Sequence, residues 1–240
     1  MNSVCVATYN GEQYIEAQLR SILAQIAPED EVIVSDDSST DKTLQIIDSI
    51  GDKRLRVVHN KTRYYRDNFE NALREAKGEI IFLSDQDDIW LDGKYERCLK
   101  ELQDVDLVCT NSHVTDENLH VINDNFFSVY HSGPGIIKNA LNSTYYGACM
   151  AFRRSLLQDA LPFPKPHEFG HDIWLGLVAE MVGKVKFIDT PYLLYRRHGQ
   201  TATTTTGLLH RSNRPLWHKI WSRVVILYYV CKFQFTHGKR

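Results

Sequence analysis

One short apolar run passes directly into a group of acids in the segment Glu79-Ile80-Ile81-Phe82-Leu83-Ser84-Asp85-Gln86-Asp87-Asp88. The run is too short for a helix, so it predicts a buried β-strand at residues 79–84. A strand that is apolar on both faces is typical of a parallel sheet with helices on each side. The acids therefore follow the carboxyl end of a central strand.

Three earlier segments repeat this order of apolar strand and polar loop. Strands are predicted at residues 4–7, 31–35 and 55–58. Helical spacing of apolar residues follows each of them, at residues 12–27, 41–50 and 69–76. Strands that alternate with helices predict an α/β fold with a mostly parallel sheet, in which ligands bind beyond the carboxyl ends of the strands. The polar clusters at residues 8–12, 36–41 and 85–88 all fall at that edge.

Beyond residue 100 the pattern is less regular. Further strands are predicted at residues 106–110, 146–152 and 185–188, with a helix at 172–182. Residues 116–134 are predicted to be rich in loops.

The charge of the chain is divided unevenly. The 240 residues carry 28 Lys and Arg against 30 Asp and Glu, a net charge of -2 that argues against a dedicated nucleic-acid binder. Residues 1–189 nevertheless have a net charge of -11, whereas the remaining 51 residues hold nine basic and no acidic side chains.

Composition also bears on the compartment. Five scattered cysteines without a CxxC pair predict neither a disulfide framework nor a zinc site, and they fit a reducing compartment. The first residues lack the pattern of a secretory signal. The longest apolar run, residues 224–231, is shorter than the about 18–20 residues that cross a bilayer. We therefore expect a cytoplasmic protein.

Residues 85–88 point to metal chemistry. Three carboxylates within four positions repel one another and need a counter-charge, which Mg²⁺ or Mn²⁺ supplies while also binding phosphates. A solvated turn with helix-capping aspartates is the alternative. A second pair, Asp36 and Asp37, ends the second strand and could accept hydrogen bonds from the base or ribose of a nucleotide. The cap of the next helix explains part of this polarity, through Ser39, Thr40 or Asp41.

Together, these motifs resemble the family 2 glycosyltransferases. The likeness rests on residues 6–12 (Val-Ala-Thr-Tyr-Asn-Gly-Glu), 35–41 (Ser-Asp-Asp-Ser-Ser-Thr-Asp), 68–69 (Asn-Phe) and 83–90 (Leu-Ser-Asp-Gln-Asp-Asp-Ile-Trp). It is closest to bacterial rhamnosyl- or galactosyltransferase-like members that assemble surface polysaccharides such as O-antigen or capsule. Order and spacing match over residues 3–100, and weaker matches extend to about residue 200. The resemblance implies a glycosyltransferase A-type (GT-A) fold and a nucleotide-diphosphate-sugar donor based on UDP, dTDP or GDP.

The resemblance also assigns roles by position. The donor nucleotide would contact Thr8, Tyr9, Glu12, Asp36, Asn68 and Asp85. Asp87 would ligate the metal that bridges the diphosphate. The family motif usually has glycine where this chain has Ser38, which leaves the geometry of that turn open.

A catalytic base is expected at the start of the helix near residue 172. Gly170-His171-Asp172-Ile173-Trp174 resembles the position where the family places Glu-Asp, with His171 in the place of the glutamate. Asp172 is then the candidate base that accepts the proton of the acceptor hydroxyl. A simple helix N-cap is the alternative.

The segment Tyr195-Arg196-Arg197-His198-Gly199-Gln200 resembles a late family segment that folds over the donor. His198 could be a metal ligand, and Arg196 or Arg197 could neutralise the diphosphate. A packing or surface role for His198 is the alternative. Residues 201–207 are predicted to be a lid that orders on donor binding.

The implied reaction is an inverting, metal-dependent transfer to a hydroxyl of a lipid-linked saccharide. A nucleotidyltransferase is disfavoured because the loop at residues 8–12 has no basic side chain. A phosphatase with an aspartate nucleophile would have its acids after the first strand rather than the fourth. A non-catalytic nucleotide-sugar-binding subunit remains the third alternative.

The chain is expected to divide at residue 207. Residues 1–207 would form the catalytic domain, with a donor half at 1–100 and an acceptor half at 101–207. Residues 208–240 mix basic side chains with Trp and Tyr, which is typical of a segment lying on an anionic membrane. The protein would then be peripheral on the inner face of the cell membrane. A helix packed on the catalytic domain is the alternative.

Overall fold

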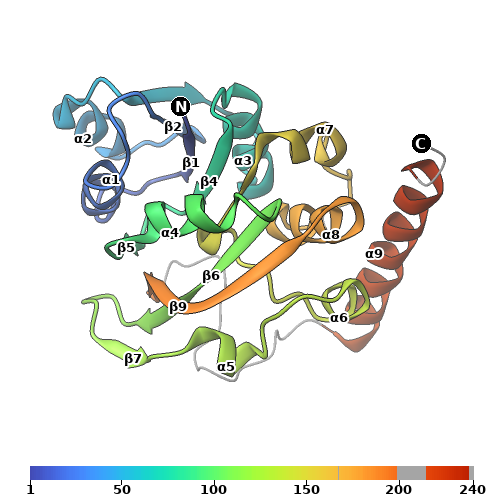
Figure 1. Ribbon diagram of the computed structural model, residues 1–240. Coiled ribbons are helices and arrows are strands. Elements are labelled where there is room, and N and C mark those ends of the chain that lie inside the picture. Colours follow the sequence, from blue (N-terminus) through green and yellow to red (C-terminus); the bar gives the residue numbers. More distant parts are fainter. Residues whose placement is uncertain (167, 199–214, 238–240) are drawn as a thin grey trace.

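A computed structural model describes residues 1–166, 168–198 and 215–237. Its described strands form one nine-stranded sheet in the order β3-β2-β1-β4-β8-β6-β9-β5, and β7 pairs with β6 (Figure 1). The predicted lid at residues 201–207 lies outside the described residues.

The first half of the chain is a parallel α/β unit. Its strands are β1 (Ser3–Thr8), β2 (Glu31–Asp36), β3 (Leu55–His59) and β4 (Ile80–Ser84). Its helices are α1 (Ile15–Leu23), α2 (Thr43–Ile50) and α3 (Tyr65–Glu75). All pairs among these four strands are parallel, as predicted. Because crossovers are right-handed, α1 and α2 cover one face of the sheet and α3, which leads back to β4, covers the other.

The second half of the sheet is mixed. Its strands are β5 (Ile89–Trp90), β6 (Leu107–Thr115), β7 (Val121–Asn123), β8 (Met150–Arg153) and β9 (Val185–Arg196). β8 lies antiparallel between β4 and β6, β9 runs parallel to β6, and β5 pairs antiparallel with β9. The parallel pattern therefore holds for the first four strands and changes beyond them.

Short helices connect the strands of this half. They are α4 (Lys94–Glu101), α5 (Phe126–Tyr130), α6 (Ile136–Leu141), α7 (Leu157–Ala160) and α8 (His171–Val182), with 3-10 turns η1 (Gly147–Cys149) and η2 (Arg154–Leu156). The strand predicted at residues 146–152 is thus a turn followed by a shorter strand. Residues 116–134 contain β7 and α5, because side chains such as Phe126 and Phe127 bury themselves there.

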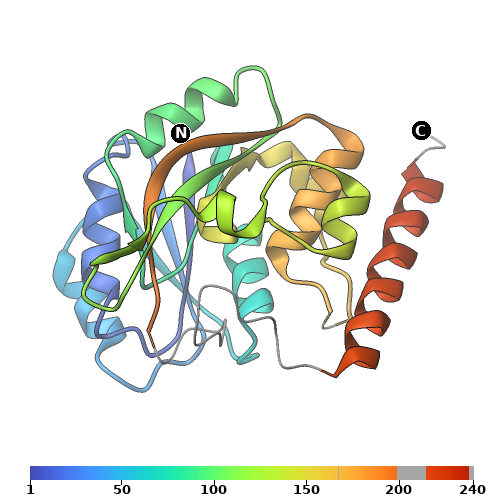
Figure 2. The ribbon, with the colours of Figure 1, turned by 90° about the horizontal axis from the view of Figure 1, so that it is seen from below.

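The last described element, α9 (Leu216–His237), lies beside α8 at one end of the molecule (Figures 1 and 2). It buries Ile226, Val230 and Phe233, and the Phe233 ring contacts the ring of Trp174 on α8 at a centroid distance of 5.8 Å. The opposite face of α9 is exposed. Among the described helices, none is both long enough and apolar enough to cross a membrane.

Candidate active site

The loop after β4 meets the end of β9. β5 follows this loop at once and pairs with β9, through Ile89 with Leu194 and Trp90 with Leu193. The pairing brings Asp87 to His198, and the carboxylate Oδ2 lies 2.8 Å from the imidazole Nε2. The two side chains that the sequence predicted as metal ligands are therefore adjacent.

Arg196 holds the loop at residues 85–88, which we call the acidic loop, in place. Its backbone N–H donates to Asp88 Oδ1 at 2.9 Å, and its guanidinium donates to the carbonyl oxygens of Asp87 at 2.7 Å and Glu117 at 2.5 Å. The guanidinium also lies 4.8 Å from the centre of the Tyr14 ring. This side chain is 7% exposed and positions the loop.

The Gln86 side chain joins the loop at residues 8–12 to the acidic loop through hydrogen bonds. Its Oε1 accepts hydrogen bonds from Thr8 Oγ1 at 2.6 Å and from the Tyr9 N–H at 2.9 Å, and its Nε2 donates to the Tyr9 carbonyl at 3.2 Å. Sequence reasoning gave Gln86 no role, although it stands between two of the predicted site residues. The polar side chains on both sides of it were the available signal.

Buried oxygens without partners gather at the ends of β1 and β2. Within the described residues, Asp36 Oδ1, Asp37 Oδ1 and Asn68 Oδ1 are buried and accept no hydrogen bond. Thr8 pairs with Asp36 in the sheet, and Asn68 Nδ2 donates to the Thr8 carbonyl at 3.1 Å, so the three side chains belong to one region. Buried acceptors of this kind need a donor, which the N–H or hydroxyl groups of a ligand could supply.

Three other predicted residues lie differently. Tyr9 is 44% exposed. Glu12 Oε2 accepts a hydrogen bond from the Lys42 N–H at 2.9 Å, so its carboxylate joins the first loop to the start of α2. The Arg197 N–H donates to the Thr115 carbonyl at 3.0 Å, which fixes its backbone at the end of β9.

The acidic loop lies in an environment that disfavours its charge. Burial, followed by the charges of Asp87 and Asp172, raises the pKa of Asp85 to about 7. Burial also raises the pKa of Asp88, and the neighbouring aspartates add to the effect. A site that holds several carboxylates at this cost is arranged for a positive charge.

Lys94 supplies one buried positive charge near these acids. It is fully buried, its Nζ donates to the Ala148 carbonyl at 2.6 Å, and the ammonium lies 4.6 Å from the centre of the Trp90 ring. Burial lowers the pKa of Lys94. Sequence reasoning passed over this residue, because a lysine at the start of an exposed-looking helix gives no sign of burial.

Asp172 lies in the first turn of α8. The N-cap of this helix is Gly170, so the N-cap alternative does not describe Asp172. Burial raises the pKa of Asp172 to about 6, against hydrogen bonds from the backbone amides of Ile173 and Gly147. The charge of Asp172 also raises the pKa of Asp85, so the predicted base lies within electrostatic range of the acidic loop.

His171, in the place of the family's glutamate, is packed inside the protein. It is 5% exposed, and its ring stacks on Phe69 with centroids 3.9 Å apart. Burial lowers the pKa of His171 to about 3, so the imidazole is neutral. It therefore packs α8 against α3 beside the base.

The described residues contain no group of three or more His, Cys, Asp and Glu side chains arranged to hold a metal ion. Asp87 and His198 still fit a cation that takes its remaining ligands from substrate phosphates and water. Mg²⁺ is commonly bound by one or two carboxylates together with substrate phosphates, and imidazole and carboxylate both suit Mn²⁺.

Fold and site together define a nucleotide-binding α/β protein, with its polar loops at the carboxyl ends of parallel strands. Residues 3–161 match the model of glycosyl transferase family 2, and the chain belongs to this family. The predicted family is thereby confirmed.

Curated relatives agree with the assignment. The chain is 27% identical to the WfaP UDP-Glc:alpha-D-GlcNAc-diphosphoundecaprenol beta-1,3-glucosyltransferase of Escherichia coli, over 95% of this chain and 91% of the relative. It is 24% identical to an uncharacterised glycosyltransferase, alr2836, of Nostoc, over 82% of this chain. The chain spans 65% of the length of the Nostoc protein.

Solved structures share the fold. TarS of Staphylococcus aureus in complex with UDP-GlcNAc matches with a TM-score of 0.69 at 21% identity, over 98% of this chain and 73% of that one. The mannosyltransferase PcManGT of Pyrobaculum calidifontis, in complex with GDP-Man and Mn²⁺, matches with a TM-score of 0.60 at 26% identity, over 79% and 54%. The GT-A fold predicted from the resemblance is confirmed.

Proposed function

We propose that this chain transfers a sugar from a nucleoside-diphosphate donor to an acceptor hydroxyl, with inversion at the anomeric carbon. The observation that carries the proposal is that Asp172, buried at the start of α8, lies within electrostatic range of Asp85, which follows β4. We therefore assign the base and the donor-binding loop to one site.

Asp172 is the residue proposed to accept the acceptor's proton. A carboxylate whose pKa burial raises to about 6 is a better base than an ordinary aspartate and is still ionised at pH 7. The acceptor oxygen attacks the anomeric carbon as the bond to the diphosphate breaks, and the proton passes to Asp172. The nucleoside diphosphate leaves, and no covalent intermediate with the protein is needed.

The donor diphosphate is proposed to bind with Mn²⁺ or Mg²⁺ at Asp87 and His198. The cation supplies charge stabilisation to the departing diphosphate. The buried oxygens of Asp36 and Asn68, which accept no hydrogen bond within the described residues, are proposed to accept from the base and ribose. Residues 1–100 thus supply most of the proposed donor contacts, and His198 adds one from the proposed acceptor half, residues 101–207.

UDP is the nucleotide we propose first, ahead of dTDP and GDP. Support comes from WfaP, whose name specifies UDP-Glc, and from the TarS complex with UDP-GlcNAc. WfaP also supports a diphosphoundecaprenol-linked saccharide as the class of acceptor. The sugar moved is proposed to be a hexose such as galactose, glucose or rhamnose, for assembly of a bacterial surface polysaccharide.

A nucleoside-diphosphate release assay tests the proposal. UDP-, dTDP- and GDP-sugars are offered with a lipid-linked GlcNAc-diphosphate acceptor, with Mn²⁺, with Mg²⁺ and with EDTA. We expect release that depends on both acceptor and cation, and an inverted anomeric configuration in the product by NMR. Release that is unchanged in EDTA would overturn the metal assignment, and retention would overturn the direct displacement.

The exposed face of α9 is proposed to hold the protein at the cytoplasmic surface of a membrane. Trp217, Trp221, Val224, Tyr228 and Phe235 are all more than half exposed and recur at helical spacing. The last 51 residues contain no acid, so an anionic lipid surface complements them, whereas a second copy of α9 would bring like charges together. Residues 208–240 would thus carry the enzyme to a lipid-linked acceptor.

A further inference from the structure

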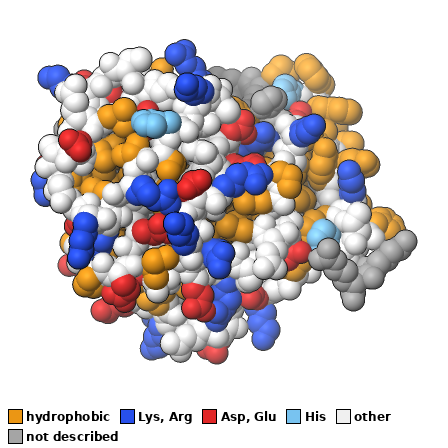
Figure 3. Space-filling model, turned by 90° about the horizontal axis from the view of Figure 1, so that it is seen from above, with side chains coloured by type: hydrophobic (Ala, Val, Ile, Leu, Met, Phe, Trp, Pro, Cys, Tyr) orange, Lys and Arg blue, Asp and Glu red, His pale blue; other side chains and the backbone are white. Residues whose placement is uncertain are grey.

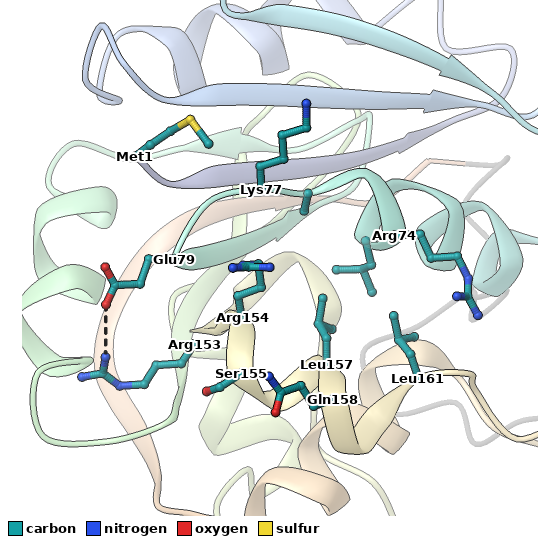
Figure 4. Close-up of a pocket in the computed structure, with 12 residues that line it drawn as sticks. Met1, Arg74, Lys77, Glu79, Arg153, Arg154, Ser155, Leu157, Gln158 and Leu161 are labelled. Carbon is teal, nitrogen blue, oxygen red and sulfur yellow. Dashed lines mark ion pairs between the residues drawn. The ribbon is translucent and has the colours of Figure 1, made fainter.

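A hollow opens at the end of the sheet opposite the candidate active site. It has a volume of about 820 Å³ and lies between the end of α3, the start of β4 and the η2–α7 segment (Figure 4). β4 separates it from the acidic loop, since residues 80–85 span about 17 Å at ~3.3 Å per residue. This hollow is therefore distinct from the donor site.

Basic side chains dominate its lining. We call it the basic groove, after Arg74, Lys77, Arg153 and Arg154, which line it together with a single acid, Glu79. The face of the molecule seen from above carries several Lys and Arg side chains near its middle, with Asp and Glu side chains among them (Figure 3). A concave surface that carries one sign of charge concentrates ions of the opposite sign.

Two of these cations are already engaged. Arg74 Nη2 lies 2.5 Å from Glu70 Oε1, and Arg153 Nη1 lies 3.8 Å from Glu79 Oε1 while its Nη2 donates to the Leu102 carbonyl. Their charges are thus partly satisfied by the protein.

Arg154 and Lys77 are the available cations. In the described parts of the chain, neither the Arg154 guanidinium nor the Lys77 ammonium has a hydrogen-bond or ion-pair partner. Arg154 lies at the centre of the lining side chains, between Lys77 and Ser155 (Figure 4). A guanidinium presents paired donors that match two oxygens of a phosphate.

The groove also has an apolar side. Leu157 and Leu161 line it below Arg154 (Figure 4). The volume is far larger than one phosphate requires and lies within the range of sites for small organic ligands. A ligand that matches both sides has a phosphate head and an apolar body.

We propose that the basic groove binds a phosphate-bearing amphiphile, with its phosphate on Arg154 and its apolar part against Leu157 and Leu161. A membrane phospholipid and a soluble phosphoester share this head-group chemistry. α7 also contacts the end of α9, where His237 Nε2 lies 3.4 Å from Asp159 Oδ1. α7 therefore both lines the basic groove and contacts the end of α9.

Calorimetric titration of the full chain tests the site with three probes: inorganic phosphate, glycerol 3-phosphate, and dihexanoyl phosphatidic acid below its micelle concentration. We expect saturable binding of the phosphatidic acid that Arg154→Gln weakens about tenfold or more. Arg154→Lys keeps the charge without the paired donors, so its affinity for the phosphatidic acid should lie between those of the wild type and Arg154→Gln. Tighter binding of the lipid than of glycerol 3-phosphate supports the contact with Leu157 and Leu161, and equal binding of the two would overturn that part of the proposal.

The matched control is Arg20→Gln, which removes an exposed arginine from α1, far from the groove lining. It should leave binding of all three probes unchanged. Equal affinity of the wild type and Arg154→Gln, or no binding to the wild type, would overturn the proposal. Titration of UDP with Mn²⁺ into the same variants measures the proposed donor site separately. If UDP does not bind, the result with the three phosphate probes still tests the basic groove.

Discussion

Ser38 follows β2 in the left-handed region of the backbone, with φ of 66°. The family's usual glycine reaches that conformation without strain, so the turn is kept although the residue differs. The Ser38 hydroxyl donates to the Asn60 carbonyl at 3.0 Å, which partly offsets the cost. The turn geometry that the sequence left open is thus the one that glycine would adopt.

Substitution at this position separates the two effects. Ser38→Ala loses the hydrogen bond and keeps the strain, so the free energy of unfolding should fall by about 1 kcal/mol. Ser38→Gly loses the same bond but removes a strain of ~1–2 kcal/mol, so it should be close to neutral. Urea denaturation of the three proteins measures both. Equal losses in the two variants would contradict the assigned strain.

Asp172 determines the predicted response of the reaction to pH. A base must be deprotonated to act, and burial raises the pKa of Asp172 to about 6. We therefore expect kcat/KM to fall about tenfold per pH unit below pH 6 and to level off above it. Initial rates between pH 4.5 and 8 with saturating metal would show this fall in kcat/KM. A plateau of kcat/KM reaching down to pH 5 would contradict the role of Asp172.

Asp172→Asn keeps the shape of this side chain and removes the base. Transfer should fall by about 10²–10⁴-fold, the usual contribution of a general base. The dissociation constant of UDP should stay within about twofold, because the proposed contacts to the nucleotide come from other loops. Full transfer activity in this variant would reject Asp172 as the base.

Asp87→Asn and His198→Ala test the metal pair. The two side chains lie 2.8 Å apart, and each is proposed to ligate the cation. Both variants should lose Mn²⁺-dependent UDP binding by about tenfold or more, since a charge-assisted contact is lost. Glu16→Gln is the control, because Glu16 is exposed on α1 and pairs with Arg20 rather than with a residue of the proposed donor site. Calorimetry that shows equal affinities for all four proteins would contradict the assignment.

At the scale of elements, Gly78 lets β4 start beside β1. A Cβ at this position would lie 2.4 Å from the backbone carbon of Asn2 and from the backbone nitrogen of Ser3. Backbone atoms held in a sheet do not move aside easily. Gly78→Ala should therefore lower the free energy of unfolding by about 1–3 kcal/mol, the usual cost of overpacking.

The neighbouring Lys77→Ala serves as its control. Lys77 is exposed in the same turn, and such surface changes stay within about 0.5 kcal/mol. Chemical denaturation monitored by circular dichroism compares the two variants with the wild type. Gly78→Ala and Lys77→Ala with the same midpoint would show that the turn can relax.

The sequence predicted the elements whose own residues favour them. β1, β2, β3 and β4 are mostly apolar, and each was predicted within one residue of its bounds. β5 has two residues and exists because it pairs with β9, which local pattern does not reveal. β9 was predicted at residues 185–188, but it continues to Arg196 because β6 pairs with it along its length.

The site was predictable to a similar extent. The acids after β2 and β4 were visible as polar clusters, whereas Asp172 and His198 needed the family resemblance as well. Gln86 and Lys94 were missed because their roles arise from tertiary contacts with Tyr9 and Ala148. Burial of a lysine depends on the surrounding fold and leaves no local signal.

At the scale of the molecule, α9 has two faces with different predicted roles. Phe233 is buried against the domain, whereas Trp217 and Trp221 are exposed on the other side. The alternative of a helix packed on the catalytic domain therefore describes one face of α9, and membrane binding is proposed for the other face. Phe233→Ala should lower the free energy of unfolding by about 3–5 kcal/mol, the cost of truncating a buried aromatic side chain.

The double variant Trp217→Ser/Trp221→Ser should leave the melting temperature unchanged and reduce binding to vesicles about tenfold or more. Co-sedimentation with phosphatidylglycerol-containing vesicles measures the binding, and residues 1–209 alone serve as a second comparison. Raising the salt concentration should weaken wild-type binding, because screening reduces the attraction of Lys and Arg to anionic lipid. Equal sedimentation of the wild type and the double variant would contradict the membrane role.

The pairing of β5 with β9 also has a consequence for the order in which a nascent chain matures. During synthesis the amino-terminal part of a protein emerges first and begins to fold, and β1–β4 need no later residue to pair with one another. Asp87 and His198, however, are 111 residues apart in sequence. The proposed metal pair therefore forms only after β9 has emerged from the ribosome, so a nascent chain would form the loops proposed to bind the base and ribose well before it could bind the metal.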